Sequence, residues 1–272
     1  MERRTFIQTL VFSSGYIVLK PHFLKRMDLF GDSFKIVMIY NNTGTSPNLK
    51  NAWGLSIWIE REKNTILFDT GGDGSILKGN IQNLSLNSDK LTKIVISHNH
   101  WDHINGIRYI LEKTLNKPKI YVVDNDLEGF NNLLPGSKIN GISKSMQIEP
   151  EVWTTGQLIG SLNGNQIFEQ SLILIQNNSI VLLTGCSHPG IVQIVKRTRE
   201  IFPDKKIECI AGGFHLMTAL ESEVIKISED LKNLGVKKIA PSHCTGEKAI
   251  SCFRNEWGDN FIELDLGMEM SL

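Results

Sequence analysis

The run His98-Asn99-His100-Trp101-Asp102-His103 places three imidazoles and a carboxylate within six residues. It directly follows KIVIS, residues 93–97, which predicts a short buried β-strand because it is apolar and rich in β-branched residues. Residues 102–113 carry isoleucine and leucine at helical spacing and predict one continuous helix. The run is therefore expected in a loop at the carboxyl end of a strand, where α/β proteins bind their ligands.

This cluster is typical of a metal site. Alternate residues of an extended chain point to the same side, so His98 and His100 can face one ion together. The turn into the helix directs Asp102 and His103 toward a neighbouring position. Imidazole with carboxylate suits zinc, manganese or iron. We therefore expect two divalent ions, zinc in the first instance, with manganese or iron as alternatives.

Strands and helices alternate through the rest of the chain, which predicts the α/β class. Apolar and alternating runs predict strands at 35–40, 55–60, 65–69, 119–123, 145–148, 152–154, 171–176, 179–184, 206–211, 236–240 and 260–264. Helical spacing predicts further helices at 75–84, 127–134, 190–201, 219–234 and 247–254.

The remaining histidines lie in later loops of the same kind. Each of the seven histidines except His22 lies in a loop directly after a predicted strand. His188 lies in TGCSHPG and His243 in PSHCTG, and this placement favours metal ligation for both. For His215, in GGFHL, three roles are open: substrate binding, proton donation, or a hydrogen bond to a metal ligand.

Three more residues are candidate partners of a metal. Asp69 ends a predicted strand, where it either orients a ligating imidazole or caps the following helix. Cys186 and Cys244 each lie near a histidine and could be soft ligands, although most buried cysteines are small apolar residues without a reactive role.

Composition and charge limit the partners. The chain has 272 residues, of which 41% are hydrophobic, which is the composition of an ordinary globular protein. Its formal net charge is zero, with 29 basic and 29 acidic residues, which gives no support for a nucleic-acid partner. A small-molecule substrate is the expected partner.

The N-terminal segment resembles an export signal. Arg3-Arg4 before Phe6-Ile7 and a short apolar stretch is similar to a twin-arginine signal. We predict residues 1–27 as this signal or a membrane anchor, giving a periplasmic or membrane-tethered protein, and residues 28–272 as one domain. Because no small-x-small cleavage site follows, the alternative is an N-terminal helix docked on a cytoplasmic protein.

The sequence resembles the metallo-β-lactamase superfamily. The run from His98 to His103 is similar to the HxHxDH signature of that superfamily, and Asp69-Thr70-Gly71 to its upstream strand-end motif. The loops TGCSHPG, GGFHL and PSHCTG resemble the branch labelled 7,8-dihydropterin-6-methyl-4-(ribofuranosyl)aminobenzene-5′-phosphate synthase-like, or metal-dependent hydrolases. The resemblance implies the metallo-β-lactamase fold, a four-layer αβ/βα sandwich with the metals at one edge of the paired sheets.

The resemblance also implies the ligand sets. The first metal would be held by His98, His100 and His188. The second would be held by Asp102, His103 and His243. The chain departs from the pattern at Thr184-Gly185-Cys186, where many hydrolase members place a bridging aspartate.

These features predict a metal-dependent hydrolase that activates water against a small-molecule ester, phosphoester or related bond. Asp102 would orient the nucleophile or accept its proton, and His215 is the second candidate catalytic residue. The alternatives on the same fold are a di-iron redox enzyme and a non-catalytic metal-binding module. Flavodiiron-like members have a glutamate where this chain has His100, which favours hydrolysis. A true lactamase is not favoured, because the later loops resemble a different branch.

Overall fold

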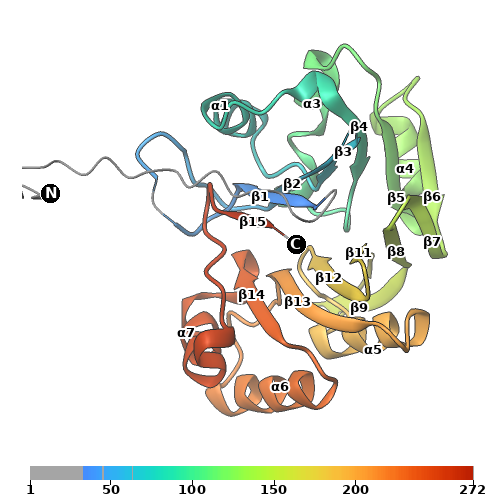
Figure 1. Cartoon of the computed structure of the whole chain (residues 1–272). Helices are drawn as coiled ribbons and strands as arrows, with labels where there is room; N and C mark the ends of the chain where they lie inside the picture. The colour runs from blue at the N-terminus through green and yellow to red at the C-terminus, as the bar shows by residue number, and fades with distance from the viewer. Residues whose placement is uncertain (1–32, 45, 63, 272) are drawn as a thin grey trace, which may run out of the picture. The chain divides into compact units, whose positions relative to one another are not determined.

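The computed structural model describes residues 33–44, 46–62 and 64–271, which belong to one compact unit spanning residues 32–272. The predicted export segment 1–27 lies outside the described residues. Two β-sheets, with helices on their outer faces, make up this unit (Figure 1).

The first sheet has seven strands in the order β15-β1-β2-β3-β4-β5-β6. Their bounds are β1 (Lys35–Tyr40), β2 (Ser56–Arg61), β3 (Asn64–Phe68), β4 (Leu91–Val95), β5 (Lys119–Val123), β6 (Ile139–Ile142) and β15 (Glu269–Ser271). Strands β3 to β6 run parallel, so the segments that follow β3 and β4 leave the sheet at the same edge.

The second sheet has six strands in the order β14-β13-β12-β11-β8-β7. Their bounds are β7 (Lys144–Glu149), β8 (Val152–Gly156), β11 (Leu172–Gln176), β12 (Ser179–Thr184), β13 (Lys206–Gly213) and β14 (Lys238–Ser242). Strands β12, β13 and β14 are parallel, and their carboxyl ends carry the three later histidine loops. A separate hairpin is formed by β9 (Leu158–Leu162) and β10 (Asn165–Glu169).

The helices cover the outer faces of the two sheets. Their bounds are α1 (Gly74–Asn83), α2 (Trp101–Ile104), α3 (Ile107–Lys113), α4 (Leu127–Leu133), α5 (Ile191–Ile201), α6 (Glu221–Asn233) and α7 (Glu247–Trp257). In Figure 1, α1 and α3 lie over the first sheet and α5, α6 and α7 over the second. None of the described helices is both long and apolar enough to cross a membrane.

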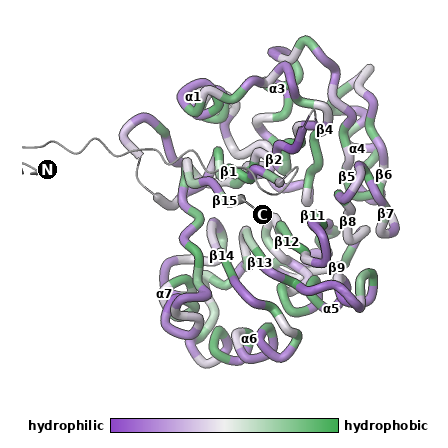
Figure 2. The backbone as a smooth tube through the Cα atoms, in the orientation of Figure 1, coloured by the Kyte–Doolittle hydropathy of each residue, from purple (hydrophilic) through white to green (hydrophobic). Residues whose placement is uncertain are grey.

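Three hydrophobic clusters hold the layers together. The central cluster joins side chains of both sheets, such as Ile57 and Phe68 from the first and Leu174 and Val181 from the second. A second cluster packs α5, α6 and α7 on one sheet, and a third packs α1, α3 and α4 on the other. Hydrophobic segments in Figure 2 accordingly gather in strands of the two sheets, for example in β1 and β12. The predicted four-layer αβ/βα sandwich is confirmed.

The helix predicted over residues 102–113 is wrong in one respect, because it is broken into α2 and α3 at Asn105-Gly106. The break follows from close packing against the segment after β3. A Cβ at Gly106 would lie 2.1 Å from the Thr70 carbonyl oxygen, and the Gly106 N–H donates to the Gly71 carbonyl at 3.3 Å. The chain bends here so that α2 can present its side chains to the edge of the sheet.

The strand predicted at 260–264 is also wrong. Phe261 makes only an isolated bridge with Ile239, and the last strand of the first sheet is β15, antiparallel to β1. The hairpin β9–β10 and strand β6 were not predicted. Their residues, 158–169 and 139–142, mix polar, glycine and apolar side chains without a sustained alternation.

Candidate metal centre

Asp69 follows β3 and organises the hydrogen bonds beneath the histidines. Its Oδ1 accepts from the Ser97 backbone N–H at 2.7 Å, and its Oδ2 lies 2.7 Å from Ser97 Oγ and 2.6 Å from His103 Nδ1. Ser97 Oγ also lies 2.9 Å from His98 Nδ1. Since the hydroxyl donates to Asp69, it accepts from His98, and His98 and His103 both keep Nε2 for another partner. Helix α1 is capped by Asp73 and not by Asp69. Of the two roles predicted for Asp69, its contacts therefore fit the orientation of a ligating imidazole.

His98, His100 and His188 form a first triad, with ligand atoms all within 4.8 Å of one another. His98 Nε2 lies 2.9 Å from His100 Nδ1. The His188 ring stands edge-on to both, with centroids 4.8 Å from His98 and 4.9 Å from His100. The extended run after β4 thus brings its two histidines to one point, and the loop after β12 supplies the third.

Asp102, His103 and His243 form a second triad within the same distance limit of 4.8 Å. Asp102 Oδ2 is 3.3 Å from His243 Nε2 and 3.7 Å from His103 Nε2. His243 Nδ1 lies 2.7 Å from Asn42 Oδ1, so the amide oxygen accepts its proton and Nε2 faces the carboxylate. Helix α2 therefore turns its acid and its histidine toward the loop after β14.

The first triad consists of neutral imidazoles. Burial, followed by the nearby His103, holds the pKa of His98 well below its usual range. Burial also lowers the pKa of His188 to about 3, with His215 as the next cause. A neutral imidazole has the free lone pair that a metal requires.

The second triad carries charge of both signs. Burial opposes protonation of His103, but the Asp69 carboxylate outweighs it and raises the pKa of His103 to about 9. Burial likewise opposes ionisation of Asp102, yet the hydrogen bond from His243 and the charge of His103 lower its pKa to about 2. Without a metal, the positive charge of protonated His103 therefore partly offsets the negative charges of Asp69 and Asp102.

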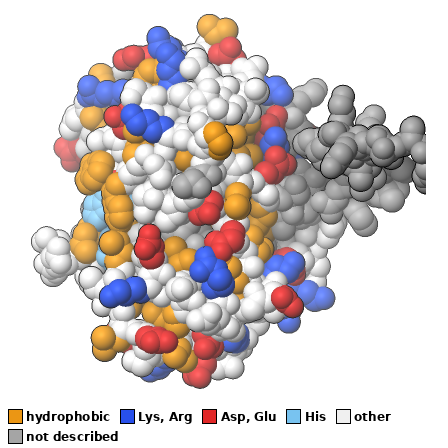
Figure 3. All heavy atoms as spheres, turned by 90° about the vertical axis from the view of Figure 1, so that its left-hand side faces the viewer, with side chains coloured by type: hydrophobic (Ala, Val, Ile, Leu, Met, Phe, Trp, Pro, Cys, Tyr) orange, Lys and Arg blue, Asp and Glu red, His pale blue; other side chains and the backbone are white. Residues whose placement is uncertain are grey.

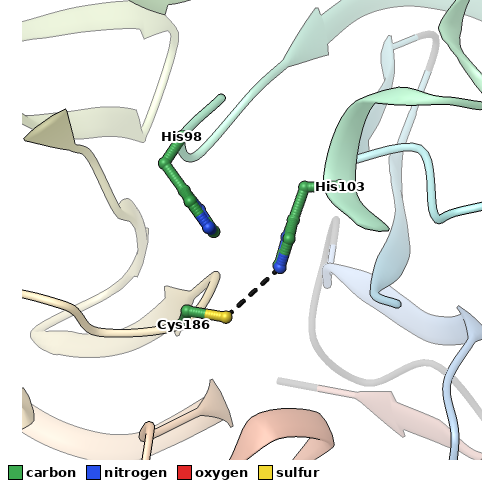
Figure 4. A group of neighbouring side chains, drawn as sticks. All are labelled: His98, His103 and Cys186. Carbon is green, nitrogen blue, oxygen red and sulfur yellow. Dashed lines mark hydrogen bonds between the residues drawn. The ribbon is translucent and has the colours of Figure 1, made fainter. Parts of the chain in front are cut away.

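Cys186 lies between the two triads. Figure 4 shows its sulfur directed toward His103, with His98 on the neighbouring segment, and the Sγ to His103 Nε2 distance is 3.3 Å. The ligand atoms within 4.8 Å of its sulfur belong to His98, His103, His188, His215, His243 and Cys244. Burial raises the pKa of the Cys186 thiol.

Glu169, the last residue of β10, holds the loop that carries Cys186 and His188. Its carboxylate accepts from three successive backbone N–H groups, those of Cys186 at 2.9 Å, Ser187 at 2.7 Å and His188 at 2.7 Å. Gly160 of β9 packs against the same loop, where a Cβ would lie 2.3 Å from the His188 carbonyl carbon. Burial raises the pKa of Glu169 to about 7. The unpredicted hairpin thus fixes the position of two site residues.

His215 lies at the exposed side of the centre. Its ring centroid is 4.3 Å from that of His188, and its ligand atom groups with those of His188 and Cys186. Hydrogen bonding with Cys244 raises the pKa of His215. The residue can therefore hold a proton beside the first triad while remaining open to a ligand.

Exposed apolar side chains surround this opening. Trp53 is 38% exposed with its ring 5.0 Å from that of His243, and Trp101, next to His100, is 56% exposed. Met217 is 54% exposed and lies close to Gly246 of the PSHCTG loop. Figure 3 shows a histidine at the surface between hydrophobic side chains, on a face where charges of both signs are interspersed. We call Trp53, Trp101 and Met217 the apolar rim.

The backbone is strained where it supports the centre. Asp69, His215 and His243 adopt left-handed conformations, with φ of 60°, 53° and 51°. Such a conformation costs a non-glycine residue on the order of 1–3 kcal/mol and is concentrated at functional sites. The surrounding packing therefore holds these three residues in place against their local preference.

The donor set fits divalent metal ions. Both ring nitrogens of His188 are buried without a hydrogen-bond partner, an arrangement that is unfavourable unless a ligand satisfies it. His98 and His103 each have Nδ1 held by a protein group, which leaves Nε2 for a metal, as in metal-binding histidines. The fold and these clusters together indicate divalent-metal binding.

Every residue predicted for the site lies in or directly beneath this group. Three contributors were missed: Ser97, Glu169 and Asn42. The sequence held one signal for Glu169, because it is a single acidic residue shortly before the apolar strand of residues 172–176. Nothing in the local sequence could have indicated Asn42, which meets His243 across 201 residues.

Comparison with known proteins agrees with this architecture. The family model of the metallo-beta-lactamase superfamily matches residues 54–172. A protein of Methanocaldococcus jannaschii named 7,8-dihydropterin-6-methyl-4-(beta-D-ribofuranosyl)-aminobenzene-5'-phosphate synthase is 31% identical over 259 residues, covering 79% of this chain and 88% of the relative. An uncharacterized protein of the same organism is 26% identical, covering 73% and 86%.

A solved structure shows the same fold. Tm1679, described as a metal-dependent hydrolase of the beta-lactamase superfamily, superposes with a TM-score of 0.73 at 24% identity, covering 88% of this chain and 99% of its own. The arrangement of sheets and helices is therefore shared over almost the whole of that protein.

Proposed function

Because the chain belongs to the metallo-beta-lactamase superfamily, whose members are mostly metal-dependent hydrolases, we propose that it hydrolyses a small-molecule ester, phosphoester or related bond at a dinuclear metal centre. The convergence of two ligand triads at the carboxyl ends of the strands carries this proposal. Its redox alternative would use two irons, and its non-catalytic alternative would bind metal without turnover.

The two ions would supply Lewis-acid activation of water and charge stabilisation at the reacting bond. The residues that would hold them are His98, His100 and His188 for the first, and Asp102, His103 and His243 for the second. The ionised Asp102 would orient the attacking water and accept its proton. Protonated His215, at the open side of the first triad, would donate a proton to the leaving group.

The apolar rim supports a substrate with a flat or aromatic portion, since tryptophan and methionine side chains bind such groups well. The name of the Methanocaldococcus relative contains a dihydropterin, an aminobenzene and a 5'-phosphate. Phosphoesters of molecules that also carry an aromatic group are therefore the first substrates to test. That relative is named a synthase, so a bond-forming reaction at the same site is the second candidate function.

The test is a screen of the metal-loaded protein against aryl phosphomonoesters, phosphodiesters and carboxylic esters. We expect turnover of at least one class, and a loss on the order of 100-fold or more in His103→Ala, because a ligand of the second ion is removed. His215→Ala should lose about 10²–10⁴-fold with poor leaving groups and less with good ones, as expected for a general acid. A fully loaded protein that is inert toward every class would overturn the hydrolase proposal.

A further inference from the structure

Cys186 and Cys244 lie in different loops, after β12 and β14, and their side chains meet beside the metal centre. Their sulfur atoms group with the imidazole of His243, with these ligand atoms all within 4.8 Å of one another. All four cysteines of the chain are free, and among the described residues Cys209 and Cys252 belong to no such group. The fold therefore brings together two thiols that are 58 residues apart in the sequence.

The backbone around the two cysteines allows this close approach. Cys244 Sγ lies 3.6 Å from the Cys186 carbonyl oxygen. At Gly213, the last residue of β13, a Cβ would lie 2.6 Å from Cys244 Sγ and 3.3 Å from Cys186 Cα. The Gly213 N–H donates to the Gly185 carbonyl at 3.1 Å, which ties β13 to the loop that carries Cys186. Any side chain at Gly213 would displace one of the two cysteines, so the glycine keeps them in contact.

Hydrogen bonds join the two sulfurs and connect them to the opening of the centre. The Cys186 thiol and the His215 ring both donate to the Cys244 sulfur. Burial opposes ionisation of Cys244, but these two hydrogen bonds outweigh it and hold the pKa of Cys244 well below its usual range. Because His215 is exposed, the Cys244 sulfur lies one side chain beneath the opening. A small oxidant that enters the opening would therefore meet this pair.

We propose that Cys186 and Cys244 form a site of reversible oxidation, at which hydrogen peroxide links them in a disulfide. The Cys244 sulfur attacks one peroxide oxygen, the O–O bond breaks, and the other oxygen takes up a proton and leaves as water. The Cys186 sulfur then attacks the Cys244 sulfenic acid, the S–S bond forms, and the hydroxyl leaves with the Cys186 proton as water. The two thiols thus lose two protons and two electrons, and one peroxide becomes two waters.

The disulfide would also change the metal centre. In the reduced protein, Cys186 Sγ lies 3.3 Å from His103 Nε2 and groups with His98 as well. Bonding to Cys244 turns this sulfur away from both histidines and shifts the loop that carries His188. We therefore expect the oxidised chain to bind metal more weakly, and metal ions held beside this sulfur to slow the oxidation. This consequence, unlike the disulfide itself, rests on the proposed dinuclear centre.

The experiment uses the full chain, freed of metal by a chelator and then treated with hydrogen peroxide. After removal of the peroxide and unfolding, iodoacetamide should modify all four cysteines of an untreated sample and two fewer in the treated one. Proteolysis without reductant should give a peptide pair that joins Cys186 to Cys244, and dithiothreitol should restore all four thiols. Four modifiable thiols after treatment, or a link through Cys209 or Cys252, would overturn the proposal.

Variants and metal loading sharpen the assignment. Cys252→Ser is the matched control and should still form the link, because Cys252 packs among the helices of the second sheet, outside the centre. Cys186→Ser and Cys244→Ser should give no linked peptides, and a link that persists in either variant would overturn the pair. The zinc-loaded wild type should form the link more slowly than the metal-free chain, whereas equal rates would contradict the contact of the pair with the centre.

The outcomes also separate this inference from the proposed function. A wild-type chain that takes up two ions and hydrolyses esters, but forms no link, would overturn the pair and leave the hydrolase intact. A chain that forms the link and hydrolyses no ester or phosphoester would uphold the pair and overturn the hydrolase.

Discussion

At the scale of single residues, Asp69 sets the protonation of the centre. It contacts His103 directly and His98 through Ser97, so one buried carboxylate orients a ligand of each triad. Since Asp69 raises the pKa of His103 to about 9, His103 of the metal-free protein is protonated at neutral pH. The same imidazole would bind the second metal ion. Metal uptake at the second triad must therefore release that proton.

This release should be measurable by titration calorimetry in buffers of different ionisation enthalpy. Between pH 7 and pH 9 the affinity of the second ion should rise by up to about tenfold per pH unit, since one proton competes with it. At pH 8, Asp69→Asn should release about one proton fewer than the wild type, because its His103 is already neutral. Equal release in the two proteins would contradict the role of Asp69.

The same raised pKa has an effect on the stability of the metal-free protein. A histidine with a folded-state pKa of about 9 and an ordinary pKa of 6.5 stabilises the fold fully below pH 6.5. That contribution is lost as the pH rises through 9. Metal loading replaces the proton and should remove this dependence.

The individual ligands could be predicted from the sequence, but several of their supports could not. Histidines in loops after strands are a local pattern, and the six histidines of the described residues lie together in one group. Glu169 and Asn42 act through contacts that only the fold creates. A local pattern contains no information about which distant backbone N–H or amide oxygen will meet a site residue.

At the scale of elements, the break between α2 and α3 positions the second triad. The sequence predicted one helix because isoleucines continue at helical spacing through Ile104 and Ile107. The close approach of Gly106 to Thr70 overrides that pattern. The Thr70 N–H also donates to the His103 carbonyl at 2.7 Å, which ties α2 to the segment after β3.

Gly106→Ala should therefore destabilise the protein by about 1–3 kcal/mol through overpacking, and weaken binding of the second ion. The matched control is Gly79→Ala on α1, where a Cβ meets nothing within 4 Å. Because alanine is the better helix former, that change should stabilise by up to about 1 kcal/mol. Thermal unfolding of the two variants measures both changes in stability. An unchanged stability in Gly106→Ala would show that the break between α2 and α3 has another cause.

At the scale of the whole molecule, the alternation of strands and helices was sufficient to predict the α/β class, and the resemblance of the motifs implied the four layers. The hairpin β9–β10 and the return of the chain to β1 as β15 were not predicted. Both depend on pairing between segments whose own sequences are weakly patterned. The hairpin nevertheless clamps the His188 loop, so part of the site depends on an element that periodicity does not indicate.

The metal content of the purified full chain tests the central claim most directly. Elemental analysis should find about two divalent ions per chain, as expected for two complete ligand triads. His98→Ala and His103→Ala should each lower that number toward one, with circular dichroism unchanged. A wild-type chain that takes up no tightly bound metal, or variants that bind as many ions as the wild type, would contradict the account.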